Sequence, residues 1–425
     1  SVHMVGRIGG LLSFALVLTA HPFLKTGNSI NLRQSRSSLG RIAGLRRGLE
    51  SLKTRAKTSA GQSGVPLGRS DMADIPTIDM ADIDLDGLKT ACKDIGFLAI
   101  QNHGIDLHLA NRVLKASTHF FDKDFKLKSE LVVGDMQRSR GYEMSPEHVA
   151  YMNVGHPEVQ DSQGYEPSSR AGIVNERFCI GPKYCPDKFR YTREKELFYP
   201  DNVFPADDTE LQALSEELYS QMTNASRRIL QALTLCLGEP HLRFCPDNCT
   251  THCSNMQIAN YPSQLWEDFN RPLRVKAHAD SGTITLLIRQ KTSEVTPTGG
   301  LQILSKDGRW LRAPPLEEGA ILVNIGNLLT VWTGGSFQST KHRVSNPVWG
   351  ENSRRLSIAY FQKPSPDTWI YSTGSSEREG VRARDLMRVG ILDKLISEKG
   401  MTNEEARHEY HRMMKSPYIL GSDSL

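Results

Sequence analysis

The feature that most constrains the fold is a series of short β-type segments in the second half of the chain. Beyond residue 255 the apolar residues recur with a period of two, and Gly, Pro, Asn and Asp turns separate the segments. Many short strands with regular turns are typical of an all-β barrel or a jelly roll. The predicted strands comprise residues 256–260, 283–289, 301–305, 320–325 and 355–361.

The first half and the end of the chain show helical periodicity instead. Apolar residues spaced three and four apart from Leu211 to Leu233 predict one long helix, and shorter helices are predicted at 88–95 and 107–125. Two short strands, at 74–79 and 97–100, precede and separate these shorter helices, and helical patterns return at 385–398 and 403–414. The sequence therefore predicts a mainly β core with flanking α-helices.

Three residues of the β-rich region could bind a metal ion. His278 and Asp280 are two residues apart, and His342 follows 62 residues after Asp280. A strand projects residues i and i+2 from one face, so the histidine and the carboxylate could project together and another strand could supply the second histidine. Two histidines and one carboxylate form the ligand set of non-haem Fe(II) oxygenases. A His-x-Asp pair alone is far more often part of a surface turn or a hydrogen-bonded core histidine, because so short a pattern arises often by chance.

A second polar pair, Arg355 and Ser357, has the same spacing on the strand predicted at 355–361. The guanidinium presents a fork of donors that fits a carboxylate, and burying it without an anion is costly. The alternative is that Arg355 lies at the mouth of the strand, paired with a local acid. The residues alone leave both interpretations open.

Between about residues 74 and 364 the sequence resembles the plant-type 2-oxoglutarate/Fe(II) dioxygenases and the related isopenicillin N synthase-like oxygenases. Several motifs in the family's order carry the resemblance: Ile75-Pro76-Thr77-Ile78-Asp79, Asn102-His103-Gly104-Ile105, Arg140-Gly141-Tyr142, Asn260-Tyr261-Pro262, His278-Ala279-Asp280, Asn324-Ile325-Gly326, His342-Arg343-Val344 and Arg355-Leu356-Ser357. The resemblance implies a double-stranded β-helix, or jelly roll, wrapped by helices.

The resemblance also implies roles for six residues. Three would hold the iron: His278, Asp280 and His342. Three would contact the distal carboxylate of 2-oxoglutarate: Arg355, Ser357 and Tyr261. Two departures stand out, because Ala259 replaces an Asn found in many relatives and Asn327 replaces a frequent Asp. The first puts one co-substrate contact in doubt, and the second is expected to have a structural consequence only.

The implied activity is O₂-dependent oxidation of a small organic molecule, most often hydroxylation. The reaction would require Fe(II) and would convert the co-substrate 2-oxoglutarate to succinate and CO₂. Ascorbate is a further candidate cofactor. One alternative is an isopenicillin N synthase-like oxidase that does not use 2-oxoglutarate. Another is a non-catalytic binding protein on the same scaffold. Four residues are candidates for contacting the substrate, although aromatic ones are commonly core: Tyr142, Glu143, Phe178 and Phe361.

Charge divides the chain unevenly. Residues 1–70 hold 11 Lys+Arg and one acid, which gives a charge of +10. Because the net charge of the whole chain is +4, residues 71–425 carry a charge of −6. An apolar run of 13 residues at 8–20 is too short to span a bilayer, and a basic, Ser-rich tract follows it to residue 70. We expect an organellar address, including a plastid reached through a bipartite leader, or a cytoplasmic one. The acidic remainder argues against a nucleic-acid partner, and oligomeric state is not readable.

The expected organisation has four parts: a targeting leader or disordered extension at 1–70, a mixed helical region at 71–250, the jelly-roll core at 251–365 and a helical segment at 366–425. The seven scattered cysteines predict reduced thiols. Cys245, Cys249 and Cys253 beside His252 form a single cluster, for which ordinary packing is favoured over zinc because zinc motifs usually hold two such pairs.

Overall fold

The structure is a computed structural model that describes residues 72–132, 140–144, 175–237, 251–262, 273–290, 300–345, 354–371, 380–387 and 402. These residues all belong to the unit that runs from Arg69 to Leu425. The leader expected at 1–70 and the helix expected at 403–414 lie outside the described residues. Of the helix expected at 385–398, only the first three residues are described.

The larger of two facing sheets has eight strands in the order β1-β2-β10-β7-β12-β5-β4-β3, antiparallel except for the β1–β2 pair. Its strands are β1 (Thr77–Asp79), β2 (Phe97–Gln101), β10 (Ile321–Ile325), β7 (Ile284–Arg289), β12 (Arg355–Phe361), β5 (Asn255–Tyr261), β4 (Glu176–Ile180) and β3 (Gly141–Met144).

The smaller sheet has four strands in the order β6-β11-β8-β9. They are β6 (Leu273–His278), β11 (His342–Ser345), β8 (Gly300–Leu304) and β9 (Trp310–Arg312). A Cβ atom added to Gly300 would lie 2.9 Å from Arg355 Nη1 of the larger sheet, so the two sheets face each other closely here. This pair of sheets confirms the predicted jelly-roll core. A further small ribbon pairs β13 (Trp369–Ile370) with β14 (Val381–Arg382).

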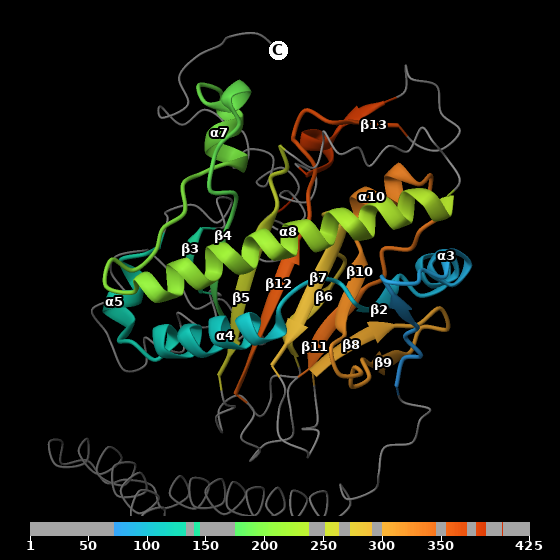
Figure 1. Ribbon diagram of the computed structural model, residues 1–425, viewed down its shortest axis with the longest axis horizontal. Helices are drawn as coiled ribbons and strands as arrows, with labels where there is room; N and C mark the ends of the chain where they lie inside the picture. Colours follow the sequence, from blue (N-terminus) through green and yellow to red (C-terminus); the bar gives the residue numbers. More distant parts are fainter. Residues whose placement is uncertain are drawn as a thin grey trace, which may run out of the picture. The chain divides into compact units, whose positions relative to one another are not determined.

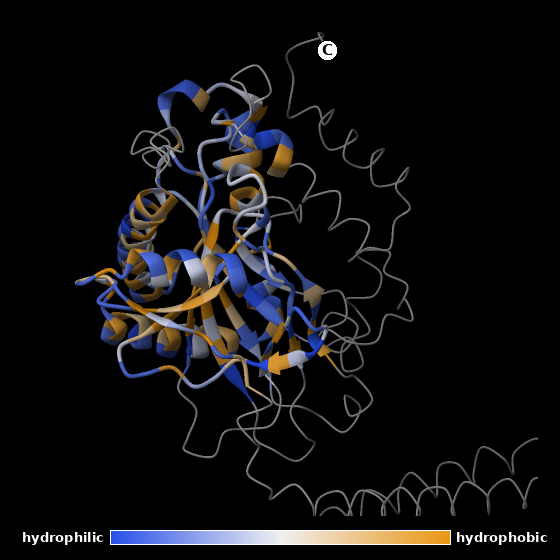
Figure 2. Ribbon diagram, turned by 90° about the vertical axis from the view of Figure 1, so that its right-hand side faces the viewer, coloured by the Kyte–Doolittle hydropathy of each residue, from blue (hydrophilic) through white to orange (hydrophobic). Residues whose placement is uncertain are grey.

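Helices cover the outer face of the larger sheet (Figure 1). The long α8 (Thr209–Leu237) and α4 (Leu107–Phe121) pack on each other and against the strands, and α3 (Leu85–Asp94) packs beside β2. On β12 the alternate residues Leu356, Ile358 and Tyr360 are buried toward these helices, and the Tyr360 hydroxyl lies 2.9 Å from Thr223 Oγ1 of α8. Each helix carries apolar and hydrophilic residues, as expected for one buried and one exposed side (Figure 2).

The long helix and five of the predicted core strands are confirmed with small shifts in their ends. The predicted end of the helix at 107–125 is wrong, because α4 ends at Phe121 and a separate helix, α5 (Phe125–Ser129), follows. The break coincides with two aspartates, Asp122 as the last cap of α4 and Asp124 as the first cap of α5. The sequence patterns did not predict strands β3, β4, β6 and β9, although β4 and β6 are no shorter than the predicted β8 and β10. The described residues also include α7 (Arg193–Phe198) and α10 (Asn327–Trp332), with a 3₁₀ turn at Asp187–Phe189.

Within the described part of the chain, no helix combines the length and apolarity that a membrane crossing requires.

Candidate active site

Three side chains converge at one end of the smaller sheet. His278 ends β6, and His342 begins β11 and pairs directly with it. Asp280 Oδ1 lies 3.6 Å from His278 Nε2 and 3.8 Å from His342 Nε2, and the three donor atoms lie within 4.8 Å of one another. The structure thus brings the three predicted residues together. Its geometry needs one correction, because β6 ends at His278 and Asp280 lies in the loop beyond the strand.

Backbone carbonyls orient both imidazole rings. His278 Nδ1 lies 2.8 Å from Lys276 O, and His342 Nδ1 lies 3.2 Å from Thr340 O. A carbonyl can only accept a hydrogen bond, so each contact favours the tautomer with its proton on Nδ1. Each Nε2 then keeps its lone pair, directed toward Asp280 Oδ1. Orientation of this kind is usual for histidines that bind metals.

The carboxylate of Asp280 is held through its other oxygen. Oδ2 accepts hydrogen bonds from Thr285 Oγ1 at 2.6 Å and from Asn324 Nδ2 at 2.8 Å, which leaves Oδ1 facing the histidines. Burial raises the pKa of Asp280, but His342, His278 and these two hydrogen bonds together outweigh it, so the pKa lies below its ordinary value. The group is therefore an anionic ligand at neutral pH.

Glycines allow the loop that carries Asp280 to pack tightly. A Cβ atom at Gly326 would lie 2.2 Å from Gly282 O, and one at Gly282 would lie 2.5 Å from Gln362 O. The first turn of α10 also holds the loop, because the backbone N–H of Asn327 donates to the backbone carbonyl of Asp280 at 2.7 Å. Packing and hydrogen bonds thus fix the backbone of Asp280 although no strand contains it.

Replacing Thr285 by valine should weaken iron binding by roughly 10- to 100-fold, the usual range when a group behind a metal ligand is lost. The change keeps the shape of the side chain but removes the hydrogen bond to Asp280 Oδ2. The iron dissociation constant measures the effect. Thr283→Val is the matched control, since the Thr283 hydroxyl donates to Gln362 O and not to Asp280. Equal effects of the two substitutions would contradict the role assigned to Thr285.

Arg355 and Ser357 lie on the face of β12 opposite the residues that pack on the helices. The Arg355 guanidinium carbon lies 5.8 Å from the centre of the Tyr261 ring, and the two residues are paired across β5 and β12. Among the described residues Arg355 makes no ion pair with any acid. Burial lowers the pKa of its guanidinium. The alternative of a local acidic partner therefore finds no support in the described part of the chain.

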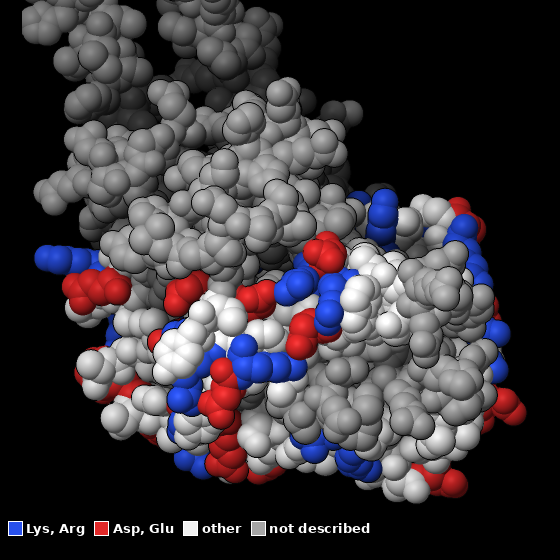
Figure 3. All heavy atoms as spheres, turned by 90° about the horizontal axis from the view of Figure 1, so that it is seen from above, with Lys and Arg blue, Asp and Glu red and all other residues white. Residues whose placement is uncertain are grey.

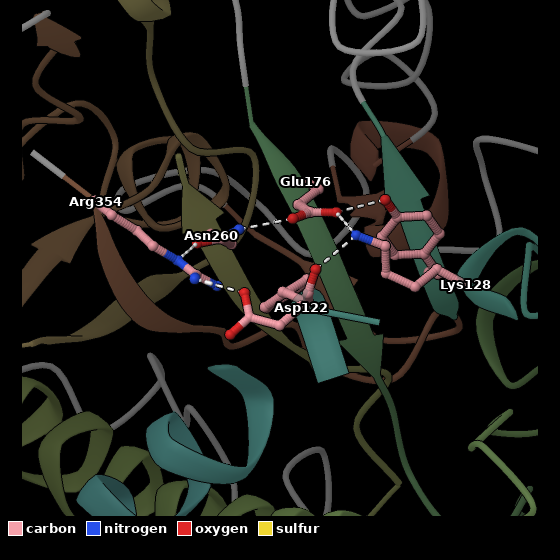
Figure 4. A network of polar contacts seen from close by, with 7 residues as sticks. Asp122, Lys128, Glu176, Asn260 and Arg354 are labelled. Atoms are coloured by element: carbon pink, nitrogen blue, oxygen red, sulfur yellow. Dashed lines mark hydrogen bonds and ion pairs between the residues drawn. The ribbon is translucent and has the colours of Figure 1, made fainter. Parts of the chain in front are cut away.

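A buried ionic cluster lies behind β5 and β4, on the helix side of the sheet (Figure 4). Glu176 accepts from Lys128 Nζ at 2.8 Å, from Asn260 Nδ2 at 2.6 Å and from the Tyr142 hydroxyl. The Lys128 and Glu176 side chains are each only 4% exposed. Two charges so deeply buried need one another and their hydrogen-bond partners.

The same cluster continues to the ends of β5 and β12. Arg354 donates to Asn260 Oδ1 at 3.1 Å and to Asp122 Oδ1 at 2.6 Å (Figure 4). Asn260 immediately precedes Tyr261, and Arg354 immediately precedes Arg355. The cluster thus fixes, from behind, the two strand ends whose next residues turn inward.

The four candidate substrate contacts separate by face. Tyr142 and Phe178 are fully buried on the helix side, where both rings pack edge-on against Phe120. The suggestion that these two contact substrate is therefore wrong, because the alternation of β3 and β4 turns them outward. Glu143 and Phe361 lie on the inner face, by their pairing with Arg177 and Thr285 respectively.

Two matches place the chain among known families. The 2OG-Fe(II) oxygenase superfamily matches residues 253–364, and the non-haem dioxygenase in morphine synthesis N-terminal family matches residues 75–186. The chain belongs to the 2-oxoglutarate/Fe(II) oxygenase superfamily. It is an oxidoreductase that uses Fe(II) and 2-oxoglutarate, and neither the keto-acid-independent oxidase nor the non-catalytic scaffold is favoured.

Two curated proteins that resemble this oxygenase are at most 29% identical to it. Clavatol oxidase claD of Penicillium crustosum is 28% identical over 70% of this chain and 86% of its own length. Validamycin A dioxygenase of Streptomyces hygroscopicus subsp. limoneus is 29% identical over 65% of this chain and 70% of its own length. A Neurospora crassa protein, in its crystal structure with alpha-KG and thymine, has a TM-score of 0.59 at 24% identity, with 76% of this chain and 98% of that chain covered, which supports the fold.

The donor set of this oxygenase fits Fe(II). Two neutral imidazoles and one carboxylate oxygen converge from one side, which leaves other coordination positions free for a chelating co-substrate and O₂. No other group of three or more His, Cys, Asp or Glu side chains in the described ranges has comparable geometry.

The cysteine cluster does not form a second metal group in the part of the chain that can be described. Cys245 and Cys249 lie outside it, and Cys253 is buried with its sulfur 3.1 Å from Pro364 O and 3.8 Å from Met387 Sδ. Burial raises the pKa of the Cys253 thiol to about 12, as expected for an inert packed cysteine.

Sequence reasoning missed three polar residues at the site: Thr285, Asn324 and Arg289. Each is a polar residue within or at the end of an otherwise apolar strand, and that is the signal that could have found them. The argument applied to Arg355 holds equally for Arg289, which ends the apolar strand β7.

Proposed function

We propose that the oxygenase hydroxylates a small organic molecule at the site between the two sheets. In this proposal three residues hold Fe(II): His278, Asp280 and His342. Three residues receive the distal carboxylate of 2-oxoglutarate: Arg355, Ser357 and Tyr261. When bound, Fe(II), O₂ and the keto acid supply the oxidising chemistry, which yields succinate and CO₂ while oxygen is transferred to the substrate.

The observation that carries this proposal is the guanidinium of Arg355, which makes no ion pair with any described acid and lies on the same inner face as Thr285, a residue that holds Asp280. Phe361 of β12 pairs with Thr285 of β7, and Thr285 donates to Asp280. The inner face of β12 thus runs from the level of the triad at Phe361 to Ser357 and Arg355 at its other end. A short dicarboxylate lying along this face would have one end near the triad and the other near Arg355.

The protein's own contribution is to hold charges and donors in place before the reactants bind. Asp280 offers a single oxygen because Thr285 and Asn324 occupy the other one. The backbone of Arg355 is fixed by its strand pairing and by the contacts of its neighbour Arg354, so less of this residue has to be ordered when the co-substrate binds.

Two observations support a small molecule rather than a nucleic acid as substrate. The names of the relatives refer to small molecules, clavatol and validamycin A. On the face seen from above, the Lys/Arg and Asp/Glu side chains of the described residues lie intermixed (Figure 3). A nucleic-acid footprint would instead need clustered positive charge.

The test is succinate formation from 2-oxoglutarate by the full-length, Fe(II)-loaded protein exposed to O₂, with and without ascorbate. Arg355→Leu should raise the KM for 2-oxoglutarate by roughly 30-fold or more, because removing one partner of a buried charge pair costs about 2–5 kcal/mol. Arg309→Leu is the control, since Arg309 is exposed and pairs only with its near neighbour Asp307 among the described residues.

Succinate that depends on the keto acid and on Arg355 would support the proposal. Tight iron binding with O₂ uptake but no consumption of 2-oxoglutarate would instead indicate the oxidase chemistry. An unchanged KM in Arg355→Leu would refute the assigned co-substrate site.

A further inference from the structure

Arg289 is a second arginine on the inner face of the larger sheet. It ends β7 and pairs directly with Ser357 of β12, and residues opposite one another in an antiparallel pair project from the same face. Its Nη2 atom donates to Pro314 O at 2.8 Å, which aims the side chain without neutralising its charge. Arg289 therefore lies beside the hydroxyl proposed to contact the co-substrate.

The guanidinium groups of Arg289 and Arg355 share no acidic partner among the described residues. In the ranges that the structure describes, neither Arg289 nor Arg355 forms an ion pair with a carboxylate. Burial, and after it the neighbouring charge of Arg355, lowers the pKa of Arg289 to about 10. Two half-buried like charges without a counterion destabilise the folded protein, and a bound anion would relieve that cost.

We propose that Arg289 is a second positioning residue for the distal carboxylate of 2-oxoglutarate, an inference that rests on the function proposed above. Donors would then reach this carboxylate from three neighbouring strands: Arg289 from β7, Arg355 and Ser357 from β12, and Tyr261 from β5. Ala259, which pairs with Ser357 from the other side, offers no donor. Arg289 thus supplies on one flank of Ser357 a contact that Ala259 cannot supply on the other.

This arrangement makes a specific demand on the ligand. Charge-assisted hydrogen bonds from two guanidinium groups stabilise a keto acid that has a carboxylate at its far end, and they do not stabilise one with an apolar end. A keto acid that chelates iron in the same way but lacks the distal carboxylate, such as 2-oxobutyrate, gains nothing from Arg289.

The experiment compares binding rather than turnover. Both keto acids are titrated calorimetrically, without O₂, into full-length Fe(II)-loaded wild-type protein, Arg289→Gln, Arg289→Lys and Arg355→Leu. We expect Arg289→Gln to weaken 2-oxoglutarate binding roughly 10- to 100-fold, because it removes a hydrogen bond between charged groups. Binding of 2-oxobutyrate should stay unchanged, and Arg289→Lys should recover part of the lost affinity.

Thermal unfolding of the same proteins without keto acid gives the second readout. A neutral residue at 289 removes one of two like charges that have no counterion among the described residues, so the melting temperature of Arg289→Gln should equal or exceed that of wild type. A purely structural arginine would instead lower it and would weaken both keto acids alike, which would overturn the inference.

The outcomes separate this inference from the function on which it rests. Normal 2-oxoglutarate binding in Arg289→Gln, with binding lost in Arg355→Leu, would overturn the role of Arg289 alone. Normal binding in both variants would overturn the co-substrate site as a whole. If Arg289→Gln folds poorly, Arg289→Lys still tests the inference. Equal affinities of the wild type and of Arg289→Lys for 2-oxoglutarate and for 2-oxobutyrate would exclude a directed contact between Arg289 and the distal carboxylate.

Discussion

Asp280→Ala should abolish keto-acid-dependent succinate formation and weaken iron binding by roughly 10²- to 10³-fold. Structural Zn²⁺ sites of four ligands bind with about 10–16 kcal/mol, so one ligand contributes on the order of 2.5–4 kcal/mol, which at about 1.36 kcal/mol per tenfold is roughly 10²- to 10³-fold. The substitution removes the only acid of the triad and also leaves the Thr285 hydroxyl and the Asn324 amide without their acceptor.

The measurement is iron retained after dialysis against a weak chelator, followed by the succinate assay on the same samples. Asp207→Ala is the control, because Asp207 is an exposed acid that pairs with Lys123 at the surface. Wild-type iron retention by Asp280→Ala would show that the metal binds elsewhere. Far-UV circular dichroism establishes that the variant is folded.

Lys128→Met should lower the free energy of unfolding by about 3–5 kcal/mol, the usual result of removing one partner from a buried ion pair. Glu176 would remain buried with hydrogen bonds from Asn260 and Tyr142 but without its counterion. Denaturant unfolding measures the loss. The same substitution at Lys123, whose partner Asp207 is exposed, should cost far less.

A double substitution gives the sharper comparison. Lys128→Met with Glu176→Gln removes both charges, so it should be more stable than Lys128→Met alone. If the two proteins unfold at the same denaturant concentration, Glu176 is not stabilised by Lys128. The cluster behind β5 and β12 would then act through its hydrogen bonds only.

The part of the site that sequence could predict is the part with a repeating pattern. Arg355 and Ser357 stand two apart on a strand that alternates throughout, so their common face follows from the period alone. His278 and Asp280 have the same spacing, yet the strand ends between them, and their convergence depends on a loop packed against Gly326 and the start of α10. The spacing of two therefore identifies the right residues, but strand geometry alone does not explain why His278 and Asp280 converge.

Alternation along a strand also does not say which face is which. Both faces of the larger sheet are covered, one by helices and one by the smaller sheet, so both faces can bury side chains. Tyr142 and Phe178 were therefore placed on the wrong side, whereas Glu143 was not. Thr285 and Asn324 meet at Asp280 only because β7 and β10 are neighbours, and that order is a property of the tertiary fold.

The triad is unequal in its access to solvent, and this has a consequence for the traffic of metal ions. The His278 side chain is 43% exposed, whereas those of His342 and Asp280 are 10% and 5% exposed. His342 and Asp280 form a fixed, buried half of the site, and His278 is the side that an arriving ion or a chelator meets first. We therefore expect exchange of the metal to begin at His278, the more exposed ligand, while the buried pair His342 and Asp280 is reached last.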